Sequence, residues 1–116
     1  MAAVRPSVVI LVTCPSVSVA RRLAKSVVKA RLAACANLVP GLTSYFWWQG
    51  RLDTAKEALL LIKTTRRVYP RLQALLKQLH PYESPEIIAL PIVAGERRYL
   101  EWIAQSVRPQ RRAGRP

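Results

Sequence analysis

The sequence is short of acidic residues and cysteine, and it has no long hydrophobic run. Six Asp and Glu stand against nineteen Lys and Arg in 116 residues, so the formal net charge is +13. Two cysteines, with no CxxC pair or Cys/His cluster, exclude a disulfide scaffold and a structural zinc site. Apolar runs of about five residues fall far below the roughly 20 that a transmembrane helix requires. The sequence therefore predicts a cytoplasmic protein that does not bind membranes, because its N-terminal apolar run is also too short for a signal peptide.

The apolar content, 51% of the residues, is high enough for a folded core. We predict a single domain over residues 1–107. Residues 108–116 contain four arginines, two prolines and a glycine but no large apolar residue. This composition predicts a basic, disordered tail.

Apolar residues that recur at steps of three and four predict two amphipathic helices and a short terminal one. Ser16 or Ser18 caps the first helix, whose inward stripe is Val19, Leu23, Val27, Ala30 and Ala34. The second helix starts near Pro70 and stops before Pro81, and its stripe is Val68, Leu72, Leu75, Leu76 and Leu79. The terminal helix directs inward Tyr99, Leu100, Ile103 and Val107.

Four segments favour strand, namely residues 8–13, 36–48, 52–64 and 87–93. The order β-α-β-β-α-β plus a terminal helix predicts an α+β, ferredoxin-like fold. Right-handed crossovers place the first and third strands at the centre of an antiparallel sheet, with both long helices on one face. Pro91 predicts an edge position for the last strand. Pro40 and Gly41 predict a bulge, and residues 49–51 a turn.

The second and third strands form a hairpin that is longer than the domain. Each has about 13 residues, or roughly 43 Å, whereas the other two strands have about six or seven. The hairpin therefore overhangs the sheet and exposes an edge that carries aromatic residues from Tyr45 to Trp48. Such an edge needs a cover. We predict that further copies of the chain supply it in a closed ring.

The topology brings the only histidine to the same edge of the sheet as one cysteine. Cys14 ends the first strand and His80 follows the second helix, with Glu83 and Glu86 close by. Cys35 lies at the opposite end of the sheet from Cys14. The Cα atoms of the two cysteines are therefore expected to be farther apart than the about 7 Å that a disulfide allows. The helix after Cys14 is expected to lower its thiol pKa. A thiolate and an imidazole suit copper or zinc, or a nucleophile with its base, although both residues also suit plain packing roles.

Eight ordered segments carry a family resemblance: 12–15 (VTCP), 31–37 (RLAACAN), 39–44 (VPGLTS), 48–50 (WQG), 62–64 (IKT), 80–82 (HPY), 85–91 (PEIIALP) and 99–102 (YLEW). Over residues 7–107 the chain resembles the CutA family of divalent-cation tolerance proteins. The resemblance implies a ferredoxin-like subunit and a tight homotrimer built on the long hairpins. It also implies a cytoplasmic, non-enzymatic role in divalent-cation tolerance, with copper or another divalent cation as the bound ion and no organic cofactor.

The copper ligands that the resemblance implies fall at Val12, Leu79 and His80, of which only His80 has a ligating side chain. Cys14 lies two residues after Val12 and therefore on the same side of the strand. We accordingly predict His80 and Cys14 as the metal-binding residues, with weak binding or binding between subunits.

Two other functions stay open. The resemblance also points to signalling trimers of the PII type, in which grooves between subunits bind a small anionic ligand. RNA-recognition domains share the strand order but require aromatic residues on the first and third strands, which this chain lacks. We therefore expect no specific nucleic-acid partner, while salt-sensitive, non-specific binding through the basic tail remains open.

Overall fold

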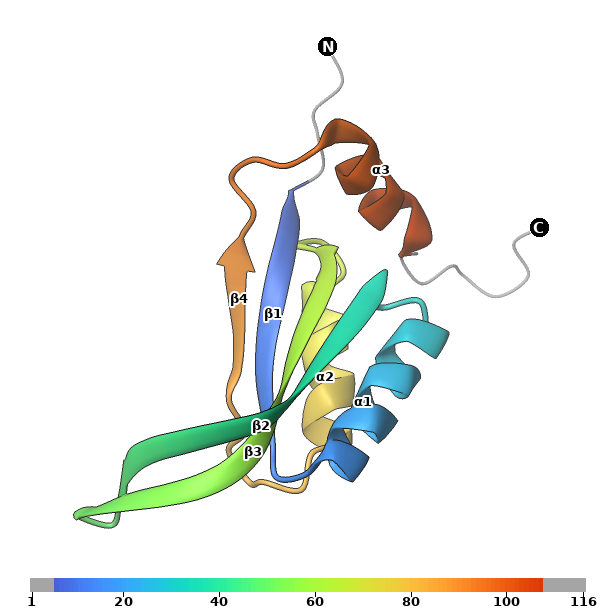
Figure 1. Cartoon of the computed structure of the whole chain (residues 1–116). Helices are drawn as coiled ribbons and strands as arrows, with labels where there is room; N and C mark the ends of the chain where they lie inside the picture. Colours follow the sequence, from blue (N-terminus) through green and yellow to red (C-terminus); the bar gives the residue numbers. More distant parts are fainter. Residues whose placement is uncertain (1–5, 108–116) are drawn as a thin grey trace.

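The computed structural model describes residues 6–107, so the predicted tail lies outside the described residues. The elements follow the predicted order (Figure 1) and confirm the α+β class. They are β1 (Ser7–Cys14), α1 (Val17–Lys29), β2 (Cys35–Trp48), β3 (Arg51–Thr65), α2 (Tyr69–Leu79), β4 (Ile87–Pro91) and α3 (Arg97–Ser106).

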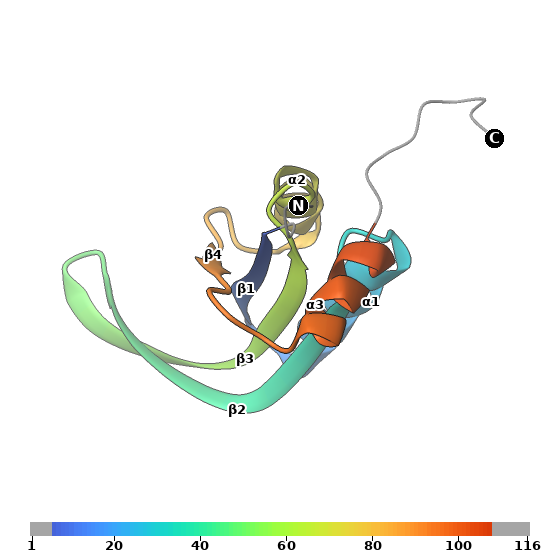
Figure 2. The ribbon, with the colours of Figure 1, turned by 90° about the horizontal axis from the view of Figure 1, so that it is seen from above.

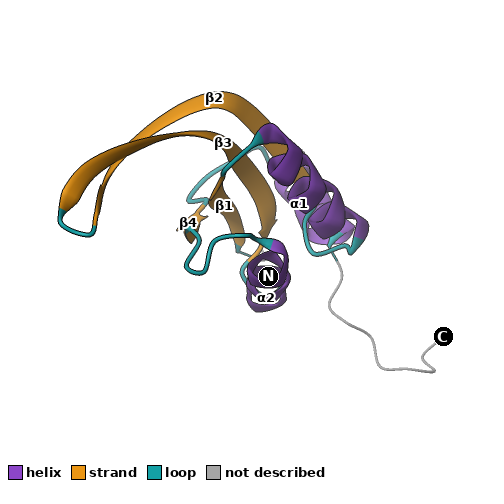
Figure 3. Cartoon of the chain, turned by 90° about the horizontal axis from the view of Figure 1, so that it is seen from below, coloured by secondary structure: helices purple, strands orange, loops and turns teal. Residues whose placement is uncertain are grey.

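The four strands form one antiparallel sheet in the order β2-β3-β1-β4. β1 pairs with both β3 and β4, which confirms its central place and the edge position of the strand that contains Pro91. Figures 2 and 3 show α1 and α2 on one side of the sheet. Alternate β1 residues are buried in the core that these helices cover: Val8, Ile10, Val12 and Cys14.

Both long helices begin as predicted, but the first ends earlier. The Ser16 Oγ accepts a hydrogen bond from the Val19 N–H at 3.1 Å and so caps α1. The helix stops at Lys29, and Arg31 adopts a left-handed φ of 62°. The predicted stripe through Ala34 is therefore wrong at its end, because the Ala34 N–H bonds to the sheet instead.

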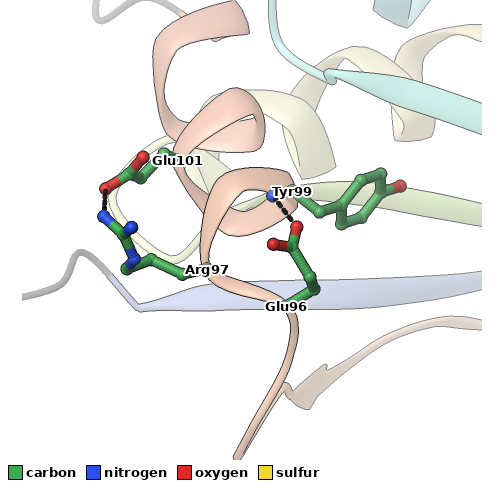
Figure 4. Close-up of polar contacts among 4 residues, drawn as sticks. All are labelled: Glu96, Arg97, Tyr99 and Glu101. Carbon is green, nitrogen blue, oxygen red and sulfur yellow. Dashed lines mark hydrogen bonds and ion pairs between the residues drawn. The ribbon is translucent and has the colours of Figure 1, made fainter.

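The terminal helix α3 is capped by a carboxylate. Glu96 accepts a hydrogen bond from the Tyr99 N–H at 2.8 Å, and Arg97 pairs with Glu101 at 3.5 Å (Figure 4). A negative charge at this end also complements the partial positive charge of the helix N-terminus. The cap therefore fixes where α3 starts.

Only part of the stripe predicted for the terminal helix points inward. Ile103 and Val107 are buried, whereas Tyr99 is 41% exposed. The Tyr99 ring contacts Trp102 with centroids 5.5 Å apart, and its hydroxyl interacts with Cys35. Tyr99 thus covers the start of β2 at the rim of the core and does not enter it.

The β2-β3 hairpin extends well past the rest of the sheet, as Figure 1 shows. β2 and β3 have 14 and 15 residues, whereas β1 has 8 and its pairing with β3 ends at Ala58. The predicted bulge appears as a register shift between Val39 and Leu42. The tip is a two-residue turn in which Gln49 and Gly50 both have positive φ, 50° and 76°. This is the type I′ geometry that suits a twisted hairpin.

The core predicts a measurable stability difference between two apolar truncations. Leu60→Ala removes a fully buried side chain under the helices, so we expect the free energy of unfolding to fall by about 2–5 kcal/mol. Val93→Ala, at a side chain 92% exposed, is the control and should change it by less than about 0.5 kcal/mol. Urea denaturation followed by circular dichroism measures both, and equal losses would contradict this account of the core.

Candidate functional site

His80 lies at the edge of the sheet where β1 ends, as predicted. It is the C-cap of α2 and only 6% exposed. Its Nε2 donates to the carbonyl oxygen of Thr13 at 2.7 Å, and its Nδ1 accepts from the Tyr82 N–H at 3.1 Å. Because a carbonyl oxygen only accepts, the ring proton sits on Nε2 and the imidazole is neutral. Both ring nitrogens are therefore engaged by the backbone.

Cys14 is the last residue of β1 and is fully buried. Burial, and then the negative charge of Glu57, raise the pKa of its thiol from 9.0 to about 11. The expectation that the following helix lowers this pKa is wrong, because loss of solvation outweighs the helix dipole. Cys14 is therefore protonated at neutral pH and has little thiolate to offer a metal or a substrate.

Two further residues complete the surroundings of Cys14 and His80. The Tyr82 hydroxyl donates to Glu57 Oε2 at 3.1 Å, and its ring lies 5.0 Å from the His80 ring. Burial first, and then the hydrogen bond to Glu57, raise the pKa of Tyr82. Sequence reasoning missed Glu57, because only the pairing of Cys14 with Ala58 places it at this edge.

The acidic residues expected beside the thiol do not build a metal site with it. Glu83 lines a shallow hollow of about 200 Å³ with Gln73, Lys77, Ser84, Pro85 and Ile87, between α2 and the loop before β4. Over residues 6–107, no three His, Cys, Asp or Glu side chains gather as a cation would require.

Cys35 lies at the other end of the sheet, as predicted. On β3, Cys35 pairs with Lys63, whereas Cys14 pairs with Ala58. These two partners are five residues apart along β3, which is about 17 Å at 3.4 Å per residue. Both thiols are free. The Cys35 Sγ donates to Asn37 Oδ1 at 3.4 Å and lies 4.0 Å from Lys63 Nζ, which also donates to Asn37. This cluster is separate from Cys14 and His80.

Comparison with known proteins identifies the family. The protein-family model described as "CutA1 divalent ion tolerance protein" matches residues 8–106. The chain belongs to this family.

Individual CutA relatives match at high identity. The divalent-cation tolerance protein CutA of Thermus thermophilus is 53% identical over 98 residues, which cover 84% of this chain and 95% of the relative. The human protein CutA is 45% identical over 94 residues, 81% of this chain and 52% of the relative. The chain thus spans nearly all of the bacterial relative and about half of the human one.

Solved CutA structures share the fold. The Thermus thermophilus protein superposes with a TM-score of 0.86 at 51% identity, over 87% of this chain and 98% of the other. CutA1 from Oryza sativa gives 0.89 at 44% identity, over 92% and 98%.

The relatives do not agree on a compartment. The CutA of Archaeoglobus fulgidus, with a TM-score of 0.85, 35% identity and coverage of 88% of this chain and 99% of the other, is described as periplasmic. None of the helices described in residues 6–107 is long and apolar enough to cross a membrane. A cytoplasmic setting for this chain therefore stays a prediction.

The two cysteines should differ in reactivity toward iodoacetamide. With a pKa of about 11, about one Cys14 thiol in a thousand is ionised at pH 8, and the fraction rises tenfold for each pH unit up to that value. In a Cys35→Ser variant, alkylation should therefore be very slow at pH 8 and accelerate toward pH 11. The matched Cys14→Ser variant retains the half-buried Cys35 and should react faster at pH 8. Mass spectrometry over time measures both, and equally fast labelling of Cys14 would refute the raised pKa.

Proposed function

We propose that this CutA-family chain acts as a cytoplasmic homotrimer in divalent-cation tolerance, with copper as the ion concerned. The observation that carries the proposal is the incomplete sheet. Residues 51–57 of β3 extend beyond the end of β1, so within residues 6–107 they have a strand neighbour only on the β2 side. Unpaired backbone donors and acceptors on a long strand are a template for another chain.

The hairpin also exposes large side chains that a partner would cover. Tyr45, Trp47, Trp48 and Leu52 are 61–75% exposed. Aromatic residues of this kind are enriched at the buried centre of interfaces. Their place on the unpaired part of the hairpin supports strand addition together with side-chain burial.

The face of the sheet opposite α1 and α2 supports the same assembly. Residues that alternate with the core positions point to this face: Leu11 and Leu61 are partly buried, and Ile88 and Leu90 are each 45% exposed. An apolar sheet face normally packs against a second layer. A hairpin from one copy laid along the next makes a head-to-tail contact, and such contacts close into a ring. Three copies is the number that the family resemblance implies.

The assembly has a defined mass. We expect light scattering after gel filtration to give about 39 kDa, three times the 13.0 kDa chain. Trp47→Glu places a charge on the exposed hairpin and should produce lighter species. Val93→Glu, at an exposed residue outside the hairpin, should keep the 39 kDa mass. A monomer in the wild-type protein would refute the ring.

Metal binding at Cys14 and His80 is proposed to be weak or to need a second subunit. The residues present do not make a preformed site, because Cys14 carries its proton and both His80 nitrogens already have backbone partners. The other two family positions hold the apolar Val12 and Leu79. A cation would thus have to displace existing hydrogen bonds. The proposal includes no catalytic step and no organic cofactor, and the CutA relatives lend no support to the PII-type alternative.

Titration calorimetry tests the metal assignment. We expect the assembled protein to bind copper or zinc with a dissociation constant well above those of dedicated metal sites but below about 1 mM. A dissociation constant of 1 mM corresponds to a binding free energy of about −4 kcal/mol. His80→Ala and Cys14→Ser should weaken this binding, and Cys35→Ser is the matched control. Circular dichroism checks that each variant is folded. Absence of binding below the millimolar range, unchanged by His80→Ala, would refute the site but leave the ring untouched.

A further inference from the structure

The loop that joins α2 to β4 passes the end of β1 (Figure 1) and depends on side chains for its position. Residues 80–86 form neither helix nor strand, and Pro81 and Pro85 have no backbone N–H to donate. The loop leads into β4, whose first residue pairs with Val12 near the end of β1. Because the loop has so few backbone donors, its contacts with the sheet are made largely by Tyr82.

Tyr82 makes three contacts at this edge. Its N–H donates to His80 Nδ1 at 3.1 Å, and its ring centroid lies 5.0 Å from that of His80. Its hydroxyl donates to Glu57 Oε2 at 3.1 Å and so joins the loop to β3, 25 residues earlier in the chain. The other ring nitrogen of His80 is bonded to Thr13. Tyr82 alone therefore occupies the second nitrogen of the imidazole and one oxygen of the carboxylate.

The thiol of Cys14 lies behind these contacts. Cys14 is fully buried and belongs to the core that α1 and α2 cover. Glu57 and Tyr82 both interact electrostatically with the thiol, so both lie close to it. Since the helices close the core side, the short way from solvent to the thiol is the end of β1, which the bond between Tyr82 and Glu57 spans.

The bond between Tyr82 and Glu57 lies at the surface of the molecule. Tyr82 is 38% exposed and Glu57 is half-buried. Breaking this bond removes no buried apolar contact, and the groups that it joins regain hydrogen bonds to water. An opening confined to loop contacts requires less free energy than unfolding of the whole chain. The loop can thus leave the end of β1 while the core stays folded.

We propose that Tyr82 is a latch that keeps solutes from Cys14 and His80 while its hydroxyl is bound to Glu57. Its release makes three groups accessible together: the thiol of Cys14, Nδ1 of His80 and the carboxylate of Glu57. A thiol and an imidazole are donors that suit copper or zinc. The latch thereby regulates the site at which cation binding is proposed. That last link rests on the proposed function, whereas the latch itself does not.

Alkylation of Cys14 by iodoacetamide at pH 9 tests the latch in a Cys35→Ser background, which leaves one thiol. Tyr82→Phe removes only the hydroxyl and should accelerate alkylation about tenfold, the factor that corresponds to about 1.4 kcal/mol for a hydrogen bond to a charged group. Tyr69→Phe is the matched control. It removes a hydroxyl that donates to Gln73 within α2 at 2.6 Å, and the rate should stay within about twofold of the background.

Two further measurements separate local opening from unfolding. If the loop opens locally, the alkylation rate of Tyr82→Phe should change little between zero and about 1 M urea, because little surface is exposed. Hydrogen exchange followed by mass spectrometry should be faster over residues 80–86 in Tyr82→Phe and in Glu57→Ala, and unchanged in α1. Glu57→Ala is read by exchange alone, since loss of this carboxylate also lowers the pKa of Cys14.

Three results would overturn the latch. Equal acceleration in Tyr82→Phe and Tyr69→Phe would mean a general loss of stability. A rate that rises steeply with urea would assign exposure of Cys14 to unfolding of the whole chain. Unchanged alkylation and unchanged exchange in Tyr82→Phe would show that its hydroxyl does not control access. No metal is present in these measurements, so the latch and the proposed cation binding are refuted by different results.

Discussion

The structure depends on a difference in strand length at the centre of the sheet. β1 has eight residues and pairs along its whole length with β3, which has fifteen. Where β1 ends, the backbone groups of the longer strand lose their neighbour on one side. The hairpin that continues beyond this point cannot be stabilised by its own core, since an isolated two-stranded ribbon is marginal in water. The same end point places Cys14, His80 and Glu57 together at the edge.

Local chemistry made most of the fold predictable. Apolar periodicity gave the helices, Ser16 and Pro81 marked two of their ends, and Pro91 identified the edge strand. The end of α1 was not predictable from periodicity, because the apolar steps continue through Ala34 while the chain turns at Arg31. The Ala34 N–H there bonds to the carbonyl oxygen of Lys63 on β3, 29 residues further along the chain, and no local pattern contains this bond.

The candidate site shows the same division between local and long-range information. The order of the elements along the chain was enough to predict that His80 lies at the end of β1, and this prediction is confirmed. The ionisation of Cys14 depends on burial and on Glu57, a residue more than forty positions away, and so the expected direction of the pKa was wrong. The result is a histidine and a cysteine that stabilise an edge of the fold from within. Exposed basic residues, by contrast, gather on α1, whereas exposed apolar residues gather on the opposite face of the sheet and on the hairpin.

The bulge near Gly41 has a consequence for which side of the hairpin each aromatic ring occupies. Before the bulge, the even-numbered Leu38 of β2 pairs with Leu60, and after it the odd-numbered Trp47 pairs with Leu52. The extra residue in β2 therefore moves its odd-numbered residues onto the face that its even-numbered residues occupied before the bulge. Tyr45 and Trp47 thereby share one surface, while Phe46 and Trp48 share the other. Shortening this strand by a single residue would exchange the two pairs. The parity of a fourteen-residue strand thus determines which rings meet which neighbour.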